Sequence, residues 1–290
     1  MEAIELLPSP WRGALEQLLL SVERDLLIAA PYIKATEANW TCDALTRRRS
    51  TGALQLRVLT DVRSDSVLGG SLDIGALKTF ADSQPGSMVV NLPRLHAKVY
   101  AADSQFAIVG SGNLTPSGLD FNYEYAVGLR DPTLVTQLRA DLESYARIGT
   151  VLDSGSLADL MDVGDELSSE YQRLQRSASS NIRRQFSQKL RRANLAFLRA
   201  QVGSRSANSL FGEAIVYVLS KGPLVTHELH PRIQSLLPDL CDDSLELVIN
   251  GEHFGKRWKH AVRNAQQSLK RMRVIEFDGR RWRLVRGGRP

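Results

Sequence analysis

The sequence predicts an α/β protein with a central, largely buried sheet, followed by a helical connector and a small helix-rich domain. Three observations lead to this prediction. Residues 1–150 alternate short apolar runs with helical patterns, residues 151–205 are long, polar and helical, and residues 206–290 combine amphipathic helices with a strongly basic end. We therefore expect a first domain over 1–150, a connector over 151–205 and a small domain over 206–290.

The first domain is expected to be layered, because its apolar runs have strand length and helical segments separate them. Runs rich in Val, Ile and Leu predict buried strands over 25–33, 54–62 and 87–93, with three more strands within 92–129. Helical spacing predicts helices over 37–50, 71–83 and 131–149. Strands that alternate with helices in this way favour a sheet covered by helices.

The composition is that of an ordinary globular protein, with 43% hydrophobic and 24% charged residues in a chain of 290. No apolar run reaches the roughly 18 residues that a membrane span needs, and the N-terminus lacks the basic start of a signal peptide. Cys42 and Cys241 lie far apart without CxxC spacing, which argues against a disulfide framework and a cysteine-built zinc site. We expect a cytoplasmic protein with no membrane partner.

The net charge of +5 is distributed unevenly along the chain. Residues 1–150 hold 14 Lys and Arg against 17 Asp and Glu, whereas residues 151–290 hold 23 against 15. Most of the excess follows Phe254, where 12 basic residues accompany only Glu276 and Asp278. A basic block of this kind indicates a polyanion partner more often than a solvated face.

Polar residues interrupt the last three predicted strands of the first domain at points that look like strand ends. His96 and Lys98 are two residues apart, so on a strand their side chains project from one face. Ser111 and Asn113 follow a buried strand in a glycine-containing segment, and Glu124 lies between two tyrosines on the next strand. Each is ordinary alone, since a lone histidine or lysine is usually structural and "GSGN" is a common turn. Together they predict a site for attack on a phosphodiester, with a nucleophile, a cation, neutral donors and an orienting acid.

The order of these residues also indicates a family. The pattern H-x-K-x4-D, formed by His96, Lys98 and Asp103 and followed by G-S-x-N and N-x-E, resembles the HKD motif of the phospholipase D superfamily. The string LHAKVYAAD…AIVGSGNLTPSGLDFNYEYAV most resembles the nuclease branch that includes metal-independent restriction endonucleases. The resemblance extends over 1–150, with the specific motif in 94–129. It makes Asp103 a structural partner near the site rather than a catalyst.

The resemblance implies a phospholipase D-like mixed sheet flanked by helices, and a phosphodiesterase that needs neither a metal nor another cofactor. His96 would attack phosphorus and form a phosphohistidine intermediate. Lys98, Ser111 and Asn113 would hold the non-bridging oxygens. Glu124 would accept a hydrogen bond from His96 and keep it nucleophilic.

Enzymes of this superfamily complete one site with two such motifs, because the second histidine protonates the leaving oxygen. This chain has one copy of the motif. The remaining histidines lack H-x-K spacing; they are His227, His230, His253 and His260. A single copy implies a homodimer through the catalytic domain, in which His96 and Lys98 of two subunits meet across a two-fold axis and a monomer is inactive.

The C-terminal segment has the element order of a winged helix-turn-helix domain. Helical patterns cover 209–222, 225–238 and 256–272, the second of them broken by Pro231, and two short strands joined by a "DG" turn follow within 273–285. The segment resembles the winged-helix segments of restriction-system proteins. The buried stripe of its third helix is expected to be Trp258, Val262, Ala265 and Leu269.

The basic residues of this segment are expected to contact DNA, with a recognition helix in the major groove and a basic wing on the phosphates. They are Arg257, Lys259, Arg263, Lys270, Arg271, Arg280, Arg281 and Arg283. A solvated helix used for protein contacts is the alternative, which the scarcity of acidic residues disfavours.

The sequence therefore predicts a cytoplasmic, homodimeric, metal-independent DNA endonuclease that acts in restriction, phage defence or DNA processing. Two alternatives stay open. One is a DNA-binding nuclease subunit whose cleavage needs a helicase or methyltransferase partner. The other is a lipid-active phospholipase D-type enzyme, which the single motif and the basic C-terminal end disfavour.

Overall fold

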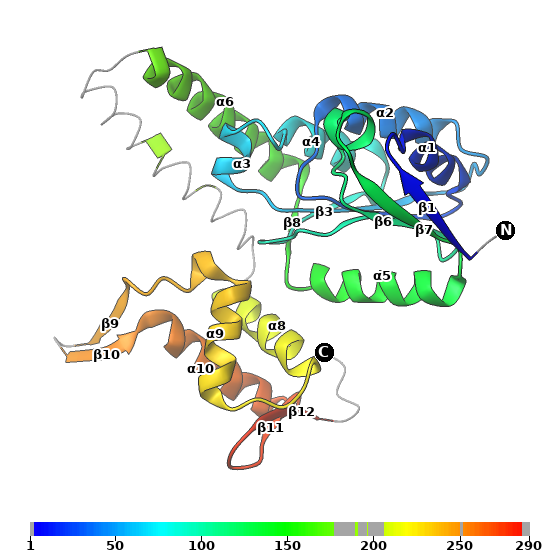
Figure 1. Ribbon diagram of the computed structural model, residues 1–290. Helices are drawn as coiled ribbons and strands as arrows, with labels where there is room; N and C mark the ends of the chain where they lie inside the picture. The colour runs from blue at the N-terminus through cyan, green and yellow to red at the C-terminus, as the bar shows by residue number, and fades with distance from the viewer. Residues whose placement is uncertain (1–2, 177–188, 191–195, 197–205, 250–251, 286–290) are drawn as a thin grey trace. The chain divides into compact units, whose positions relative to one another are not determined.

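The computed structural model describes residues 3–176, 189–190, 196, 206–249 and 252–285. The chain forms two compact units, Met1–Gly203 and Ser204–Pro290 (Figure 1). Each unit is described by itself.

An eight-stranded mixed sheet forms the centre of the N-terminal unit, in the order β1-β7-β6-β5-β2-β3-β4-β8. Strands β2, β3 and β4 run parallel, and every other neighbouring pair is antiparallel. The strands are β1 (Ile4–Pro8), β2 (Asp25–Ala29), β3 (Gln55–Thr60), β4 (Met88–Asn91), β5 (Lys98–Ala102), β6 (Phe106–Gly110), β7 (Tyr125–Leu129) and β8 (Thr150–Leu152). The structure confirms the predicted mixed sheet flanked by helices.

Helices cover both faces of this sheet (Figure 1). One face carries α1 (Arg12–Ser21), α2 (Ala35–Thr46), α3 (Ser64–Leu68), α4 (Ile74–Ser83) and α6 (Ser154–Arg176). The other face carries α5 (Pro132–Ala146). Its N-cap is Asp131, whose carboxylate accepts hydrogen bonds from the main-chain nitrogens of Thr133 and Leu134. Arg139 of α5 donates to the main-chain oxygen of Ala101 at 3.1 Å, which ties this helix to β5.

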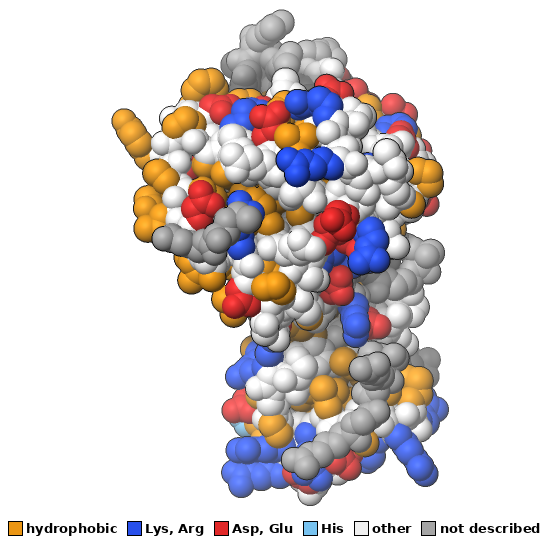
Figure 2. Space-filling model, turned by 90° about the vertical axis from the view of Figure 1, so that its right-hand side faces the viewer, with side chains coloured by type: hydrophobic (Ala, Val, Ile, Leu, Met, Phe, Trp, Pro, Cys, Tyr) orange, Lys and Arg blue, Asp and Glu red, His pale blue; other side chains and the backbone are white. Residues whose placement is uncertain are grey.

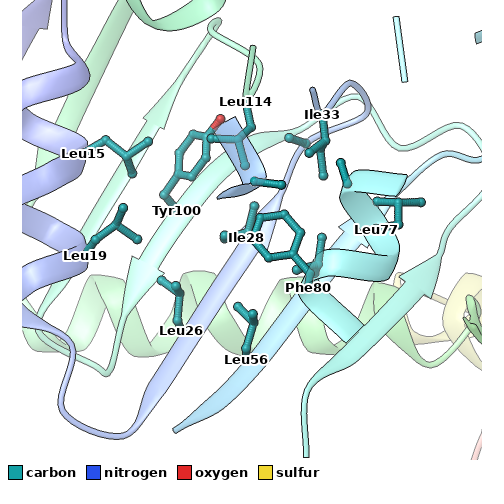
Figure 3. Packing of buried hydrophobic residues seen from close by; sticks show 14 of the residues in the cluster. Leu15, Leu19, Leu26, Ile28, Ile33, Leu56, Leu77, Phe80, Tyr100 and Leu114 are labelled. Atoms are coloured by element: carbon teal, nitrogen blue, oxygen red, sulfur yellow. The ribbon is translucent and has the colours of Figure 1, made fainter. Parts of the chain in front are cut away.

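The main core lies between the sheet and the α1, α2 and α4 layer (Figure 3). Its side chains come from apolar residues at helical spacing on the helices and from alternate residues on the strands. The figure shows Leu15 and Leu19 of α1, Leu26 and Ile28 of β2, Leu56 of β3, Leu77 and Phe80 of α4, Tyr100 of β5, and Ile33 and Leu114. All ten are at most 2% exposed, so this core holds the helices firmly against the sheet.

The N-terminal unit extends past the boundary that we expected at residue 150. Strand β8 pairs with β4 at the sheet edge, and α6 packs against α3 and α4. The first part of the expected connector is therefore part of this unit, while most of 177–205 lies outside the described residues. Strand β1 was not predicted, and it pairs with β7 because Ile4, Leu6 and Pro8 stand opposite Leu129, Val127 and Tyr125.

The C-terminal unit contains helices and two short hairpins. Its elements are α8 (Ala207–Ser220), α9 (Thr226–Leu236), the 3-10 turn η2 (Pro238–Leu240), β9 (Glu246–Ile249), β10 (Glu252–Lys256), α10 (Arg257–Arg271), β11 (Ile275–Phe277) and β12 (Trp282–Leu284). Leu224 bridges Trp282, so a third short segment joins the β11–β12 hairpin. Trp258, Val262, Ala265 and Leu269 are buried on α10, at the spacing that we predicted.

Two features of this unit differ from the sequence prediction. Helix α9 continues through Pro231, although the sequence predicted a break there. Proline removes one backbone donor, and here the burial of Leu229 and Ile233 on either side outweighs that loss. The β9–β10 hairpin between α9 and α10 was not predicted, because its residues show no clear alternation of apolar and polar side chains. In the part of the chain that the structure describes, no helix is long and apolar enough to cross a membrane.

Candidate active site

The polar residues of the predicted site gather at one edge of the eight-stranded sheet. Because β5 runs antiparallel to β2, the N-terminal end of β5 lies at the carboxyl ends of β2, β3 and β4. The register continues outward, with Lys98 opposite Gly110 and Gly110 opposite Ala126. The residues just before β5, just after β6 and just before β7 therefore meet at this edge.

His96 and Lys98 lie side by side at the start of β5. Lys98 is the first residue of the strand and only 8% exposed, whereas His96 precedes the strand and is exposed. The Lys98 Nζ lies 3.3 Å from Nδ1 and 3.2 Å from Nε2 of His96, and it donates to the His96 main-chain oxygen at 2.9 Å. The near-equal distances place the ammonium against the ring between its two nitrogens, not in line with one lone pair. The structure thus brings a cation beside an accessible imidazole.

The charge state of Lys98 depends on two opposing effects. Burial lowers the pKa of Lys98, because desolvation disfavours the ammonium, and the negative charge of Glu124 raises it in part. Glu124 therefore favours the charged form of the only buried lysine in the described chain.

Ser111 and Glu124 form a hydrogen-bonded pair beside this cation. The Ser111 hydroxyl donates to the Glu124 carboxylate, and the Tyr125 main-chain nitrogen donates to Ser111 Oγ at 3.2 Å. Asn122 Nδ2 donates to the other carboxylate oxygen at 3.1 Å. The backbone of Glu124 is fixed as well, since its nitrogen donates to Ser9 Oγ at 2.7 Å. Two donors thus hold the carboxylate of Glu124, and a third contact holds its backbone.

Glu124 does not contact His96 as the resemblance implied. In the described residues its carboxylate is hydrogen-bonded to Ser111 and Asn122. Strand β6 separates β5 from β7, so the two residues start about two inter-strand spacings, or about 9–10 Å, apart. Within one chain, Glu124 orients Ser111 and acts on Lys98 through its charge.

The GSGN segment after β6 is held by two buried aromatic side chains. Tyr100 donates its hydroxyl to the Gly112 main-chain oxygen at 3.1 Å, and Trp11 Nε1 donates to the Gly118 main-chain oxygen at 2.8 Å. Burial raises the pKa of Tyr100 well above its usual value, so the phenol stays a donor. A Cβ on Gly112 would lie 2.5 Å from the Gly118 oxygen and 2.7 Å from Trp11 Cζ2. Only glycine fits there, which brings the segment close to the sheet edge.

Asn113 lies half-buried in this segment. Its main-chain oxygen accepts from Thr115 at 2.8 Å. Its Oδ1 is buried and has no hydrogen-bond partner among the described residues.

Asp103 lies at the opposite end of β5, which corrects the expectation that it is near the site. Five residues separate it from Lys98, about 17 Å along a strand. Its carboxylate accepts from the main-chain nitrogens of Glu23, Arg24 and Asp25 at 2.8, 2.9 and 2.9 Å, and its φ is 51°. Asp103 fixes the turn before β2.

The residues predicted to bind DNA lie in the C-terminal unit, whereas the candidate active site lies in the N-terminal unit. Arg257, Arg263, Lys270 and Arg271 are exposed on α10, and Lys259 is half-buried with its ammonium 5.5 Å from the Trp258 ring. Arg280, Arg281 and Arg283 are exposed at the β11–β12 hairpin, where Arg283 pairs with Glu276 at 2.8 Å. Figure 2 shows lysine and arginine side chains gathered on this unit.

Two polar residues on α10 were missed by the sequence prediction. Asn264 and Gln267 are exposed on the face opposite the buried stripe, next to Arg263 and Arg271. Helical spacing from Trp258 and Val262 places them there, so the signal was present in the sequence. Among the described residues, no group of three or more His, Cys, Asp or Glu side chains is arranged to hold a metal ion.

Comparison with known protein families finds one similarity, which covers the segment that holds this edge. Residues 15–146 match the family model described as "Cardiolipin synthase, PLD-like domain". This segment contains β2 to β7 and α2 to α5, and it is similar to a phospholipase D-like domain. No curated protein matches the sequence.

Several solved structures are similar to part of this chain at low sequence identity. They include Nuc, a phospholipase D family member from Salmonella typhimurium, with 19% identity over 52% of this chain and 97% of that chain and a TM-score of 0.44. NucT from Helicobacter pylori has 16% identity, covers 51% of this chain and 98% of that chain, and gives a TM-score of 0.40. Phosphatidylserine synthase from Haemophilus influenzae Rd KW20 has 16% identity, 59% and 46% coverage and a TM-score of 0.46. Likenesses of this strength do not decide the substrate.

Proposed function

We propose that this protein is a metal-independent DNA phosphodiesterase, an endonuclease that acts as a homodimer with His96 as its nucleophile. The observation that supports this most directly is the pairing of an exposed imidazole with the buried ammonium of Lys98, 3.2 Å from Nε2, at the edge that also holds Ser111 and Asn113. A fixed cation beside a nucleophile lowers the barrier to attack on a charged phosphodiester.

The reaction would proceed in two displacements. A nitrogen of His96 attacks phosphorus, the bond from phosphorus to the leaving oxygen breaks, and a phosphohistidine forms. The His96 of the second copy gives its proton to the leaving oxygen. That same histidine then takes a proton from water, which attacks phosphorus and releases His96, so protons and electrons balance over the cycle.

The other residues of the edge would stabilise charge on the phosphoryl group. Lys98 places its ammonium on the non-bridging oxygens, and Ser111 and Asn113 supply neutral donors. Glu124 holds the Ser111 hydroxyl in position and favours the charged form of Lys98. These roles require a cation and neutral donors instead of a bound metal.

The C-terminal unit would bring the protein to DNA as a winged helix-turn-helix domain. The bridge between Leu224 and Trp282 and the exposed basic residues of α10 and the β11–β12 hairpin support this proposal. Arginine, asparagine and glutamine side chains make the common contacts to base edges in the major groove. Arg263, Asn264 and Gln267 offer such side chains on one helix face, and the remaining cations suit phosphates.

The sequence resemblance supports a cytoplasmic role in restriction, phage defence or DNA processing. A helicase or methyltransferase partner is the accessory subunit that such systems suggest. The two alternatives are a nuclease subunit that needs a partner and a lipid-active enzyme.

The test is cleavage of plasmid and oligonucleotide DNA by the purified full-length protein in excess EDTA. The wild-type protein is expected to cut, and His96→Ala is expected to abolish cleavage while still binding DNA, because it removes the proposed nucleophile. His227→Ala is the matched control, because His227 is also exposed and has no lysine two residues later. A folded dimer that cuts no DNA would refute the solo nuclease.

Further assays separate the alternatives. Cleavage that appears only when a helicase or methyltransferase encoded beside it is added would identify a nuclease subunit. Release of choline or glycerol from phospholipid vesicles, without DNA cleavage, would identify a lipid-active enzyme.

A further inference from the structure

The segment between the π-helical turn η1 (Ser117–Phe121) and β7 carries exposed aromatic side chains beside the candidate active site. Phe121 is 78% exposed and Tyr123 is fully exposed, which makes them the two most exposed large hydrophobic residues in the described part of the chain. Tyr125, the first residue of β7, adds a third ring at 54% exposure. Single hydrophobic residues are common on protein surfaces, whereas three rings within five residues indicate a binding surface. We call Phe121 and Tyr123 the aromatic pair.

The backbone that leads into the aromatic pair is anchored to the start of α1. The main-chain oxygen of Leu119 accepts a hydrogen bond from the main-chain nitrogen of Trp11 at 3.2 Å. The carboxylate of Asp120 accepts from Nε of Arg12 at 2.8 and 2.9 Å. Phe121 follows these two residues directly, so its position is set by buried and ion-paired neighbours.

The backbone on the other side of the pair is fixed as well. The main-chain nitrogen of Glu124 donates to the main-chain oxygen of Asn122 at 3.0 Å, which places Tyr123 at the tip of a three-residue turn. The Ser9 hydroxyl donates to the main-chain oxygen of Glu124 at 3.0 Å. A ring held out by a fixed backbone loses little freedom when a ligand binds, so it is prepared for binding.

The aromatic pair lies within one nucleotide of the residues that would hold the phosphate. Tyr123 stands between Asn122 and Glu124, and Asn122 Nδ2 donates to the Glu124 carboxylate at 3.1 Å. The same carboxylate accepts from the Ser111 hydroxyl. Neighbouring Cα atoms are about 3.8 Å apart, and stacked bases of one strand are about 3.4 Å apart. A base next to a phosphate at Ser111 is therefore within reach of the Tyr123 ring.

The charges around the rings suit an uncharged, flat ligand. Asp120 is hydrogen-bonded to Arg12, and Glu124 is hydrogen-bonded to Ser111 and Asn122, so protein donors already hold both carboxylates. An anionic lipid surface would be repelled by these two carboxylates. A nucleobase carries no charge, and it offers a π-face on which an aromatic ring can stack.

We propose that the aromatic pair stacks on unpaired bases beside the scissile phosphate, so that the enzyme selects DNA whose strands are open at the point of cleavage. In a duplex the neighbouring bases cover each base face, so a protein ring stacks only on a base that has left the helix. This inference rests on the proposed phosphodiesterase function and adds to it the class of substrate. Phe121 and Tyr123 are its specificity-determining residues.

The first test measures binding without cleavage, in the full-length His96→Ala protein. The probes are a fluorescein-labelled single-stranded oligothymidylate of about 12 nucleotides and the corresponding duplex. Tyr123→Leu keeps an apolar side chain but removes the ring face, so single-strand binding should weaken about 5-fold or more while duplex binding stays unchanged. Tyr123→Phe keeps the ring and should bind as tightly as its parent. Tyr171→Leu is the matched control, because Tyr171 is exposed on α6, which packs against α3 and α4.

The second test measures cleavage with His96 in place. The substrates are an oligonucleotide duplex with a short unpaired stretch and the fully paired duplex of the same sequence. The protein should cut within the unpaired stretch. Tyr123→Leu should raise KM for this substrate and leave kcat unchanged, because a stacked flanking base contributes equally to binding the substrate and the transition state.

The outcomes separate this inference from the proposed function. The inference is wrong if the parent protein does not bind the single strand, if Tyr123→Leu binds it as tightly, or if Tyr171→Leu loses as much. A Tyr123→Leu protein that changes in mass by light scattering, or that loses binding only to phosphatidylglycerol vesicles, would assign the ring to another protein chain or to a lipid surface and overturn the inference. Phe121→Leu replaces Tyr123→Leu if that variant unfolds. Loss of single-strand binding in Tyr123→Leu, in a protein that cuts no DNA, would support the stacking site and refute the proposed function.

Discussion

The ammonium of Lys98 donates to the main-chain oxygen of His96 at 2.9 Å while 92% of the lysine surface is removed from solvent by the sheet around it. This relationship sets a basic group against the proposed nucleophile, His96, before any substrate is bound. It also costs stability, because burial disfavours the charged form that the proposed reaction needs.

Removing this charge should stabilise the fold and abolish catalysis together. Burial lowers the pKa of Lys98, so the folded state bears the cost of the desolvated ammonium as long as the side chain is charged. Lys98→Met is expected to raise Tm by about 2–4 °C, the shift that about 1 kcal/mol produces in a domain of 150–250 residues. Calorimetry beside a hydrolysis assay measures both effects.

The rise in Tm for Lys98→Met should depend on pH, because burial lowers the pKa of Lys98 in the folded protein. Above the folded pKa and up to the usual value of 10.5, the unfolded chain binds more protons, so wild-type stability rises with pH and the advantage of Lys98→Met should shrink. Lys78→Met serves as the control, since Lys78 forms a partly exposed pair with Asp82 and should show no gain. A lower Tm for Lys98→Met at pH 7 would contradict the interpretation.

Asp103 should matter for stability and not for catalysis. Asp103→Ala removes the acceptor of three main-chain donors and leaves alanine at a φ of 51°, which should cost about 2–4 kcal/mol. The folded fraction should keep its hydrolysis rate, because the residue lies at the far end of β5. Urea unfolding and a rate per folded molecule measure the two.

The more conservative substitution Asp103→Asn should cause a smaller loss of stability than Asp103→Ala. Oδ1 of Asp103 accepts from both Arg24 and Asp25, so Asp103→Asn can keep two of the three bonds and tolerates a positive φ. It should cost less than half as much as Asp103→Ala. Loss of hydrolysis in a fully folded Asp103→Asn protein would mean that the residue acts on the site.

Gly112 should not tolerate a side chain. The Cβ of Gly112→Ala would meet the Gly118 main-chain oxygen and the buried Trp11 ring, neither of which can swing away. Overpacking of this kind costs about 1–3 kcal/mol, and the displaced segment would move Ser111 and Asn113. Thermal unfolding and hydrolysis should both decline.

A second glycine supplies the control for this change. Gly13 lies in α1, two residues from Trp11, and a Cβ there meets nothing within 4 Å. Gly13→Ala should be neutral or stabilise by about 0.5–1 kcal/mol, since alanine favours a helix. Equal destabilisation by both variants would show that space at Gly112 is not the cause.

If the basic residues of α10 contact DNA, they should contribute to the salt dependence of DNA binding. Arg263→Ala is expected to weaken DNA binding and to reduce the slope of log K against log salt concentration by about 1, the change for one lost phosphate contact. A slope that stays the same with relaxed sequence preference would instead assign Arg263 to a base. Fluorescence anisotropy from low to moderate salt measures this.

The control for this charge change lies in the N-terminal unit. Arg49 is exposed after α2, so Arg49→Ala removes the same charge away from α10. Its slope should match the wild type. A matching decline in both variants would point to net charge as the cause.

The sequence by itself predicted which polar residues belong to the candidate site and the mixed sheet that holds them. His96 and Lys98 were placed on one face by a spacing of two, and Ser111, Asn113 and Glu124 by their positions at strand ends, because both depend only on local periodicity. The buried stripe of α10 at Trp258 and Val262 followed from helical spacing for the same reason.

Tertiary structure alone decided how these residues meet. Strand β6 stands between β5 and β7, so Glu124 bonds Ser111 instead of His96, and Asp103 falls at the far end of β5. The pairing of β1 with β7, which exposes Leu6 and Tyr125 on one face, joins segments more than 100 residues apart. Strand order and register depend on long-range pairing and on which face is buried, and no local pattern in the sequence encodes either.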